Sequence, residues 1–524
     1  METETKRLSL SRFVRWKFWR NVLVLLAGLV TVYALFCAEE NLRGKRAWEA
    51  YKSEVEAKGE VLDFRKFVPP PVPDDQNFAA IPFFAQLFDY IPGTHTLRDT
   101  NSWTRVGILT SLLPNSVHDL DGGYWRHAKS LDFVDLANKW ETTNRSSQNP
   151  PAFTTDQTSN AIEFITGKLE PATAVIEEMR KASQRPYSRF NVEYDAEPKF
   201  SIILPHLAGI NSAYRILALR SCAELQSGGT DAAFADTRLM FRLVHSLQSE
   251  PFLVSQLVRA ASFGATLQPV WEGLEQRKWS DEQLKELISE LRGLDFTGDA
   301  MRCLQAEQSF CDTFFEQLRK SRNPMQDISD VVGNDNNFST PDFPAELLVM
   351  LAPSGWFYLE QLNYHKLYYN QTVGVLSPNR VDPDLANERK NPSFGGNSFA
   401  SAFLKHEEMA KLLLPSLQSF VFKVTRAQTG ANLAAIGCAL ERYRLKHGNY
   451  PENLSALAPE YLPAIPKDLI MDQPLKYHLT ANGTFILYSV GWNNKDDGGI
   501  AVKGNKDMTE GDWVWEYPAA SVSR

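Results

Sequence analysis

The sequence predicts a mainly α-helical protein. It should have a single N-terminal transmembrane helix, a helical bundle or irregular solenoid in its middle, and a C-terminal α+β module with one long helix and a small antiparallel sheet. Three observations predict this class. They are an uncharged segment near the N-terminus, apolar residues at helical spacing over most of residues 155–320, and an Asn-Gly turn between two strand-like runs near the C-terminus.

The chain has 524 residues, which is too many for one ordinary hydrophobic core. A net charge of −8 argues against a nucleic-acid partner, because nucleic acids select basic surfaces. The expected divisions are a basic cytoplasmic tail (1–20), a transmembrane helix (21–38), a helical stalk with a proline-rich spacer (39–92), a mainly helical domain with irregular loops (93–398) and an α+β domain (399–524).

The N-terminal residues have the pattern of a membrane anchor. Residues 21–38 carry no charge, and as a helix they span about 27 Å, close to the thickness of the hydrocarbon layer. Trp16, Phe18 and Trp19 lie at the preceding basic edge, where interfacial aromatic residues belong. The positive-inside rule then places the N-terminus in the cytoplasm and the chain after Ala38 on the other side. A cleaved signal peptide is the alternative, although its apolar core is usually shorter.

The segment that follows the anchor is polar and then stiff. Residues 39–59 predict a polar helix, and the VPPPVPDD run at residues 68–75 predicts an extended spacer, because consecutive prolines fix the backbone. Residues 77–92 are strongly apolar, so we expect them to dock onto a domain rather than stay exposed.

Residues 93–150 are irregular and contain one cluster of metal-ligand types. His118, Asp119, Asp121 and His127 lie within one short stretch. No established ligand spacing matches them, and an Asp-Gly-Gly turn before a helix explains the same residues. A metal site therefore remains the less favoured interpretation.

Helical periodicity dominates residues 155–320. Apolar residues recur at steps of three and four, Gly228 and Gly229 interrupt the pattern, and Ser280 with Gln283 forms a capping-box signature. No fixed repeat length is present, so a bundle or an irregular solenoid is expected rather than a regular repeat array. His206 and His245 lie within these helices, where core or surface roles are commoner than ligand roles.

The C-terminal residues predict a long helix followed by a sheet. Apolar residues keep helical spacing up to Tyr443, and Gly448 then stops the helix. Asn482-Gly483 lies between two strand-like runs and predicts a hairpin, and residues 513–518 supply a third strand.

The order of these motifs is similar to that of a known family. ALERYRLKHGNYPENLSAL, then YLPAIPKD, QPLKYHL and NGTFILYSVG, resembles the C-terminal domain of the type II secretion major pseudopilin, over residues 424–517. The whole chain also resembles membrane-anchored envelope proteins of Gram-negative bacteria, which share the anchor, the proline-rich spacer and the helical middle. That second resemblance implies the bacterial inner membrane, with one membrane pass and the bulk of the chain in the periplasm, but no activity.

Several features depart from the pseudopilin pattern. The processing site is missing, and the membrane segment lies far from the module instead of running straight into it. The apolar stretch before the module contains Pro415 and is too short to span a bilayer. We therefore expect a borrowed fold, or docking to pilus-like machinery, rather than assembly into a pseudopilus.

The resemblance also implies a calcium loop. In the major pseudopilin the loop after the YS-x-G motif binds calcium, and here it offers Asn493, Asp496, Asp497 and Asp512. Oxygen ligands of this kind suit calcium. Asn493 is neutral where the family has its first acidic ligand, and extra residues precede Asp512, so a solvated loop is the alternative. Calcium is the only cofactor that the sequence suggests.

Two classes of function follow from these features. The sequence contains no HExxH, GxSxG, Walker or CxxC motif, so no catalytic residues are assigned. The first hypothesis is a non-catalytic membrane-anchored envelope protein with a scaffold or interaction role linked to type II secretion or pilus-like machinery, with envelope or secretion proteins as partners. The alternative is an envelope hydrolase with its site between the helical middle and residues 93–150.

Overall fold

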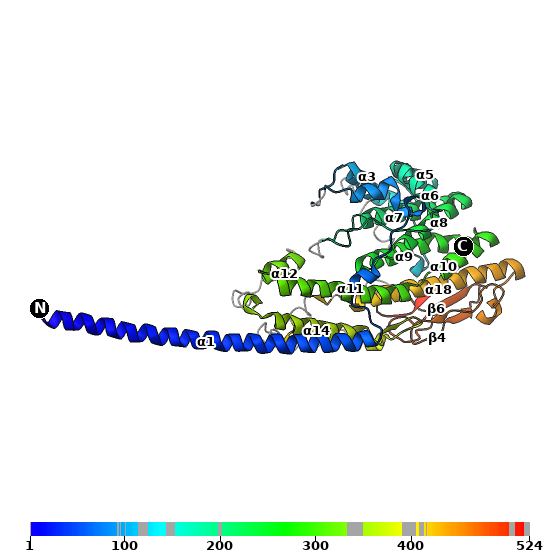
Figure 1. Ribbon diagram of the computed structural model, residues 1–524. Helices are drawn as coiled ribbons and strands as arrows, with labels where there is room; N and C mark the ends of the chain where they lie inside the picture. The colour runs from blue at the N-terminus through cyan, green and yellow to red at the C-terminus, as the bar shows by residue number, and fades with distance from the viewer. Residues whose placement is uncertain are drawn as a thin grey trace. The chain divides into compact units, whose positions relative to one another are not determined.

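The computed structural model describes residues 2–91, 94, 96–99, 101–113, 124–142, 152–196, 202–332, 349–389, 405–407, 413–414, 417–501 and 509–517. The chain divides into two compact units (Figure 1). The first unit contains Met1–Leu62, Gln308–Asn370 and Pro392–Pro415. The second contains Asp63–Glu307, Gln371–Asn391 and Ser416–Arg524.

The described residues are mainly helical, as predicted, with short antiparallel strands toward the C-terminus. The α-helices are α1 (Glu2–Ala57), α2 (Pro82–Ala85), α3 (Asn101–Ser111), α4 (Phe133–Thr142), α5 (Thr158–Leu169), α6 (Thr173–Ala182), α7 (His206–Ser227), α8 (Thr230–Ser246), α9 (Leu253–Glu275), α10 (Asp281–Arg292), α11 (Phe296–Lys320), α12 (Pro324–Val332), α14 (Ser354–Thr372), α15 (Pro383–Glu388) and α18 (Leu417–His447). Single 3₁₀ turns are η1 (Phe64–Phe67), η2 (Asp74–Gln76), η3 (Phe78–Ala80), η4 (Gln86–Phe88), η6 (Tyr124–His127), η7 (Glu170–Ala172) and η9 (Leu454–Leu457). The strands are β1 (Leu376–Ser377), β2 (Arg380–Val381), β3 (Lys467–Asp468), β4 (Gln473–Pro474), β5 (Lys476–Leu479), β6 (Phe485–Ser489) and β7 (Trp513–Glu516).

Helix α1 is continuous from the basic N-terminal residues through the apolar segment to the end of the polar stretch. The predicted transmembrane helix and the predicted polar helix are thus one element. The apolar side chains of residues 21–36 are mostly exposed, and the helix is long and apolar enough to cross a membrane.

In the first unit, the polar half of α1 packs closely on α14. Trp48 of α1 forms a small core with Leu359 and Leu362 of α14. A Cβ atom built on Gly44 would lie 2.2 Å from the carbonyl oxygen of Gly355, so the two backbones approach more closely than side chains permit. The glycines at this crossing therefore set the distance between the helices.

A buried polar cluster also belongs to the first unit. The Asp312 carboxylate on α11 lies 2.7 Å from Nε2 of His365 and accepts a 2.6 Å hydrogen bond from Gln361, both on α14. Arg319 in turn donates to Gln361 at 2.7 Å. These contacts pair polar groups that would otherwise be costly to bury.

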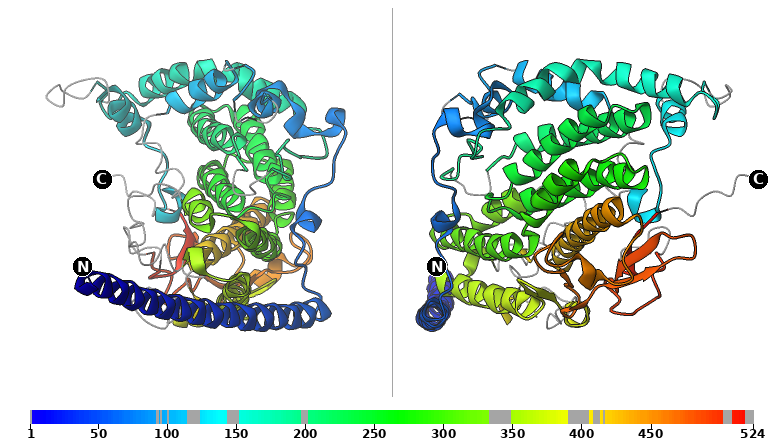
Figure 2. Two further views of the ribbon diagram at one scale, coloured as in Figure 1. Left: turned by 60° about the vertical axis from the view of Figure 1, so that its left-hand side comes forward. Right: turned by 90° about the vertical axis from the view of Figure 1, so that its right-hand side faces the viewer.

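In the second unit, successive helices pack in antiparallel order. Helix α7 contacts α8 and α9, and α18 contacts α9 and α10 (Figure 2). Gly228 ends α7 with φ of 86°, as its position in the sequence predicts. The capping box of Ser280 and Gln283 at the start of α10 is confirmed.

The C-terminal helix and sheet are present as predicted. Strands β5, β6 and β7 form one antiparallel sheet, with Leu479 opposite Phe485 across the Asn-Gly turn. Gly448 terminates α18 with φ of 84°. Helix α18 lies against both this sheet and the helices α9 and α10 (Figure 2). Its apolar residues belong to one core with Trp515 of β7 and Trp271 of α9. The predicted boundary at residue 399 lies outside the described residues.

The two short hairpins, β1–β2 and β3–β4, were not predicted. Each strand has two residues, which is too short to show an alternating pattern in the sequence. The hairpins are linked, because the N–H of Val381 donates to the carbonyl of Leu469 at 2.7 Å.

Candidate functional site

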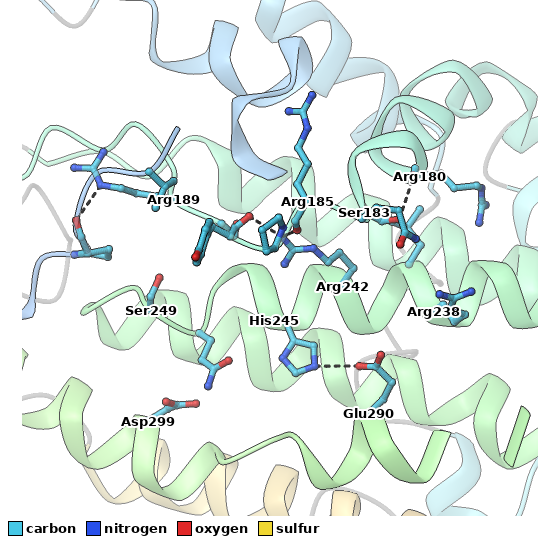
Figure 3. Close-up of a pocket in the computed structure, with 18 of the residues that line it drawn as sticks. Arg180, Ser183, Arg185, Arg189, Arg238, Arg242, His245, Ser249, Glu290 and Asp299 are labelled. Atoms are coloured by element: carbon cyan, nitrogen blue, oxygen red, sulfur yellow. Dashed lines mark hydrogen bonds and ion pairs between the residues drawn. The ribbon is translucent and has the colours of Figure 1, made fainter. Parts of the chain in front are cut away.

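A cavity of about 850 Å³ lies within the second unit (Figure 3). It is bounded by the proline-rich spacer, the end of α6 with the loop after it, one face of α8, and parts of α10 and α11. This volume is in the range of sites that bind small organic ligands. The lining residues on which its charge depends are Arg180, Arg185, Arg189, Arg238, Arg242, His245, Glu290, Asp299 and Arg302.

Helix α8 supplies the middle of the cavity. Arg238, Arg242 and His245 follow one another at steps of four and three, which places them on one face of the helix. The opposite face of α8 carries apolar residues such as Phe241 and Val244, which are fully buried in the core. Core packing thus holds the helix so that its basic stripe faces the cavity.

Two of the lining arginines are neutralised by carboxylates. Arg238 lies 2.6 Å from Glu286. Arg180 lies 3.0 Å from Glu177 and also forms an ion pair with buried Asp236. These two arginines add little net positive charge to the cavity.

Four other arginines bond to carbonyl oxygens instead, and none forms an ion pair with a carboxylate in the described part of the chain. Arg185 donates to the carbonyls of Asp74 and Asn77 at 3.3 and 3.0 Å. The other three are Arg189, which donates to Pro69 at 2.9 Å, Arg302, which donates to Gln248 at 3.2 Å, and Arg242. Carbonyls satisfy single N–H groups without cancelling the charge, so Arg185, Arg189 and Arg242 keep the side formed by the 183–189 loop and α8 positive.

Arg242 is the most constrained of the four. Its terminal nitrogen donates to the carbonyls of Arg185 and Tyr187 at 3.0 and 2.7 Å, and its guanidinium lies 4.6 Å from the ring centre of Phe78. Nε is buried and has no hydrogen-bond partner among the described residues. Burial lowers the pKa of Arg242 to about 10, while the charge of Glu290 opposes that shift. Because Nε is closed off from solvent, an anion in the cavity would meet the terminal nitrogens of this half-buried cation rather than Nε.

The wall formed by α10 and α11 has hydrogen-bond acceptors. Nε2 of His245 lies 3.2 Å from the Glu290 carboxylate, and Figure 3 shows the imidazole pointing from α8 toward it. Asp299 accepts a 2.8 Å hydrogen bond from Arg259, which lies outside the cavity lining. The cavity is therefore asymmetric. The side formed by the 183–189 loop and α8 carries cations without carboxylate partners, and the side formed by α10 and α11 carries two carboxylates together with Arg302.

The predicted metal residues near the N-terminal half are only partly described. His118, Asp119 and Asp121 lie outside the described residues, and His127 is in η6. Much of residues 93–150, beside which the hydrolase alternative places its site, is also outside them.

The structure brings the predicted calcium residues into one loop but ties their oxygens to donors of that loop. Asn493 donates to Asp497 at 2.8 Å, and the Asp512 oxygens accept the N–H groups of Asp497 and Gly499 at 3.3 and 2.7 Å. Asp496 accepts the Tyr488 hydroxyl at 3.0 Å. No group of three or more acidic, histidine or cysteine side chains in the described residues converges as metal ligands would. Calcium binding at this loop therefore stays a prediction.

Two buried carboxylates outside the cavity have structural contacts. Glu250 lies 2.7 Å from His206 and accepts a 2.5 Å hydrogen bond from Ser255. Because Ser255 bonds to the carboxylate rather than to the histidine, the three do not form a serine nucleophile activated by a base. Glu272 on α9 accepts the N–H of Leu131 at 2.9 Å and so fixes the loop after η6.

The cavity was missed at the level of sequence, where His245 was interpreted as a core or surface residue. The signal that could have found it is the spacing of Arg238, Arg242 and His245 along one helix. This signal alone is weak, because a basic stripe is usually a solvated face. Only the packing of the 183–189 loop over α8 encloses the charge.

Comparisons with family models, with curated proteins and with solved structures found no match to this chain.

Proposed function

We propose that this chain is a membrane-anchored, non-catalytic binding protein of the bacterial envelope, and that its helical unit holds an anionic ligand in the arginine-lined cavity. Arg242 carries the proposal, because its side chain lines the cavity, its charge is half-buried and it has no carboxylate ion-pair partner in the described residues. Arginine suits anion recognition, since its planar donors match carboxylate and phosphate oxygens.

The anchor in this proposal is α1. The protein itself leaves the apolar residues of α1 exposed, and a bilayer would cover them. The basic residues before them favour a cytoplasmic N-terminus. A single pass through the inner membrane would place the cavity in the periplasm. A link to type II secretion or pilus-like partners rests on the resemblance of residues 424–517 to the major pseudopilin.

The proposal is tested by thermal unfolding of the full chain in detergent, with sulfate or phosphate compared against chloride at equal ionic strength. A ligand that binds only the folded state stabilises it by about 2.7 kcal/mol at one hundred times its dissociation constant. We expect the multivalent anions to raise the Tm of the wild type.

The decisive variant is Arg242→Gln, which should lose this response. Arg292→Gln is the matched control, because it makes the same charge change on an exposed residue of α10 that does not line the cavity. Equal anion responses in the wild type and Arg242→Gln would contradict the proposal.

A further inference from the structure

The uneven distribution of charge in the cavity restricts the class of anionic ligand that it can bind. The inference about that class rests on the proposed function. We propose that the ligand is an acidic saccharide, that is, a sugar bearing a carboxylate or a phosphate. Three features of the lining carry this proposal: a positive side, an opposite side rich in acceptors, and an exposed aromatic ring between apolar residues.

The positive side takes the acidic group. Arg242 supplies the charge of its guanidinium from α8, and Arg185 and Arg189 add charge from the loop after α6. Carboxylate and phosphate share the oxygen geometry that a guanidinium recognises. The arginines therefore favour an anionic group on the ligand, which can be a carboxylate or a phosphate. The binding experiment below distinguishes the two.

The opposite side takes hydroxyl groups. Glu290 is a hydrogen-bond acceptor that would repel a second anion but accepts readily from sugar hydroxyls. Asp299 adds acceptor oxygens, while Arg259 at 2.8 Å balances its charge. Ser249 and Gln248 line the same side and add groups that donate and accept. A ligand with negative charge at both ends would leave Glu290 facing like charge, so a polyphosphate fits less well.

The ring of Tyr187 supplies a surface for a sugar ring. Tyr187 lines the cavity and is 50% exposed, so part of its surface is open to a ligand. Its backbone is fixed, because its carbonyl accepts from Arg242 and from the N–H of Phe78 at 2.8 Å. The C–H groups on one face of a pyranose carry partial positive charge and pack on the negative face of such a ring. Pro70 and Pro186 extend the apolar surface around it.

The test compares four probes by calorimetry on the full chain in detergent: glucose 6-phosphate, glucuronate, glucose and inorganic phosphate. We expect one or both acidic sugars to bind at least tenfold more tightly than glucose and than phosphate, and the better of the two identifies the acid. Phosphate binding as tightly as both acidic sugars would overturn the saccharide inference and leave the proposed function intact. If no probe binds, both fail.

A variant separates recognition of the sugar from recognition of the charge. Tyr187→Ala removes an exposed side chain, so folding should be preserved, and it should weaken acidic-sugar binding about tenfold without changing phosphate binding. Tyr369→Ala, which changes another exposed tyrosine outside the cavity lining, should change neither. An unchanged affinity of Tyr187→Ala for the acidic sugars would overturn the stacking role and with it the saccharide inference.

Discussion

At the residue scale, the second unit contains two kinds of buried charge. Asp236 and Arg259 are matched by partners, Asp236 by Arg180 and Arg220, and Arg259 by Asp299 at 2.8 Å. Arg242 has no such partner in the described residues. An ion pair balances the charge of both its members within the fold, whereas the carbonyl and ring contacts of Arg242 leave its positive charge without an ion-pair partner. This difference distinguishes the proposed ligand site from structural ion pairs.

Glu272 gives a prediction that depends on pH. Burial raises its pKa to about 7, although hydrogen bonds from Gln268 and Leu131 favour the ionised form. The pKa of Glu272 is higher in the folded chain than in the unfolded chain. Its contribution to the free energy of unfolding is therefore fully present below the unfolded pKa and is lost as the pH rises through about 7. Glu272→Gln keeps an acceptor oxygen, and because the amide does not ionise, its contribution to stability does not fall as the pH rises. We expect its unfolding free energy, relative to wild type, to rise by about 2 kcal/mol between pH 5 and pH 8.

Chemical denaturation at pH 5, 6.5 and 8 measures this difference. Glu163→Gln makes the same charge change at an exposed position on α5 and serves as the control. A pH dependence of Glu272→Gln that parallels the wild type would show that Glu272 is not buried as a carboxylic acid.

At the element scale, the crossing of α1 and α14 depends on its glycines. In Gly44→Ala the new Cβ would lie 2.2 Å from a carbonyl oxygen of the backbone, so the helices must separate. We expect this variant to destabilise the first unit by roughly 1–3 kcal/mol, as overpacking does. Gly28→Ala is a matched change in the same helix, and nothing lies within 4 Å of its Cβ, so it should be neutral.

Limited proteolysis of the two α1 variants in detergent measures local opening at this crossing. Faster cleavage in Gly44→Ala than in Gly28→Ala is expected. Equal cleavage rates would mean that α1 and α14 do not cross as closely as described.

The loop between β6 and β7 gives a second prediction at this scale. If Asn493, Asp496, Asp497 and Asp512 bind calcium, the ion would replace hydrogen bonds that now hold the loop. Millimolar calcium should then raise the Tm of the full chain relative to a chelator, and Asp512→Asn should abolish the rise. An unchanged Tm of the wild type in calcium would contradict the prediction of a calcium site.

Local signals predicted the elements well, and tertiary contacts explain what was missed. The Ser280 capping box, the glycine at the end of α7 and the Asn-Gly turn each act within a few residues, so the sequence shows them directly. The strands β3 and β4 depend on contacts between distant residues. Asp468 of β3, for example, accepts from Ser489 at 2.8 Å and from the N–H of Val490 at 3.1 Å.

At the scale of the whole molecule, the membrane orientation is a separate prediction. Helix α1 and the basic N-terminal residues predict that the chain after the apolar segment lies in the periplasm. A reporter that is active only in the periplasm, fused after Arg524, should therefore be active. The same reporter fused after Arg20 is the control and should be silent. A silent C-terminal fusion would contradict the predicted orientation of α1 in the membrane.

The candidate site could not be predicted at this scale, because its walls come from distant parts of the chain. The spacer, the 183–189 loop, α8, α10 and α11 contribute to one cavity. In each segment taken alone, the charged residues have the pattern of an ordinary solvent-exposed surface. Only their packing reveals that Arg242 is half-buried without a carboxylate partner in the described residues.

The central claim is that the cavity at Arg242 binds an anion, and the most direct measurement is a crystal structure with tungstate, an anion whose position anomalous scattering locates. We predict a tungstate within hydrogen-bond distance of the Arg242 guanidinium in the wild type and its loss in Arg242→Gln. Tungstate bound elsewhere on the protein, with none at Arg242, would contradict the account.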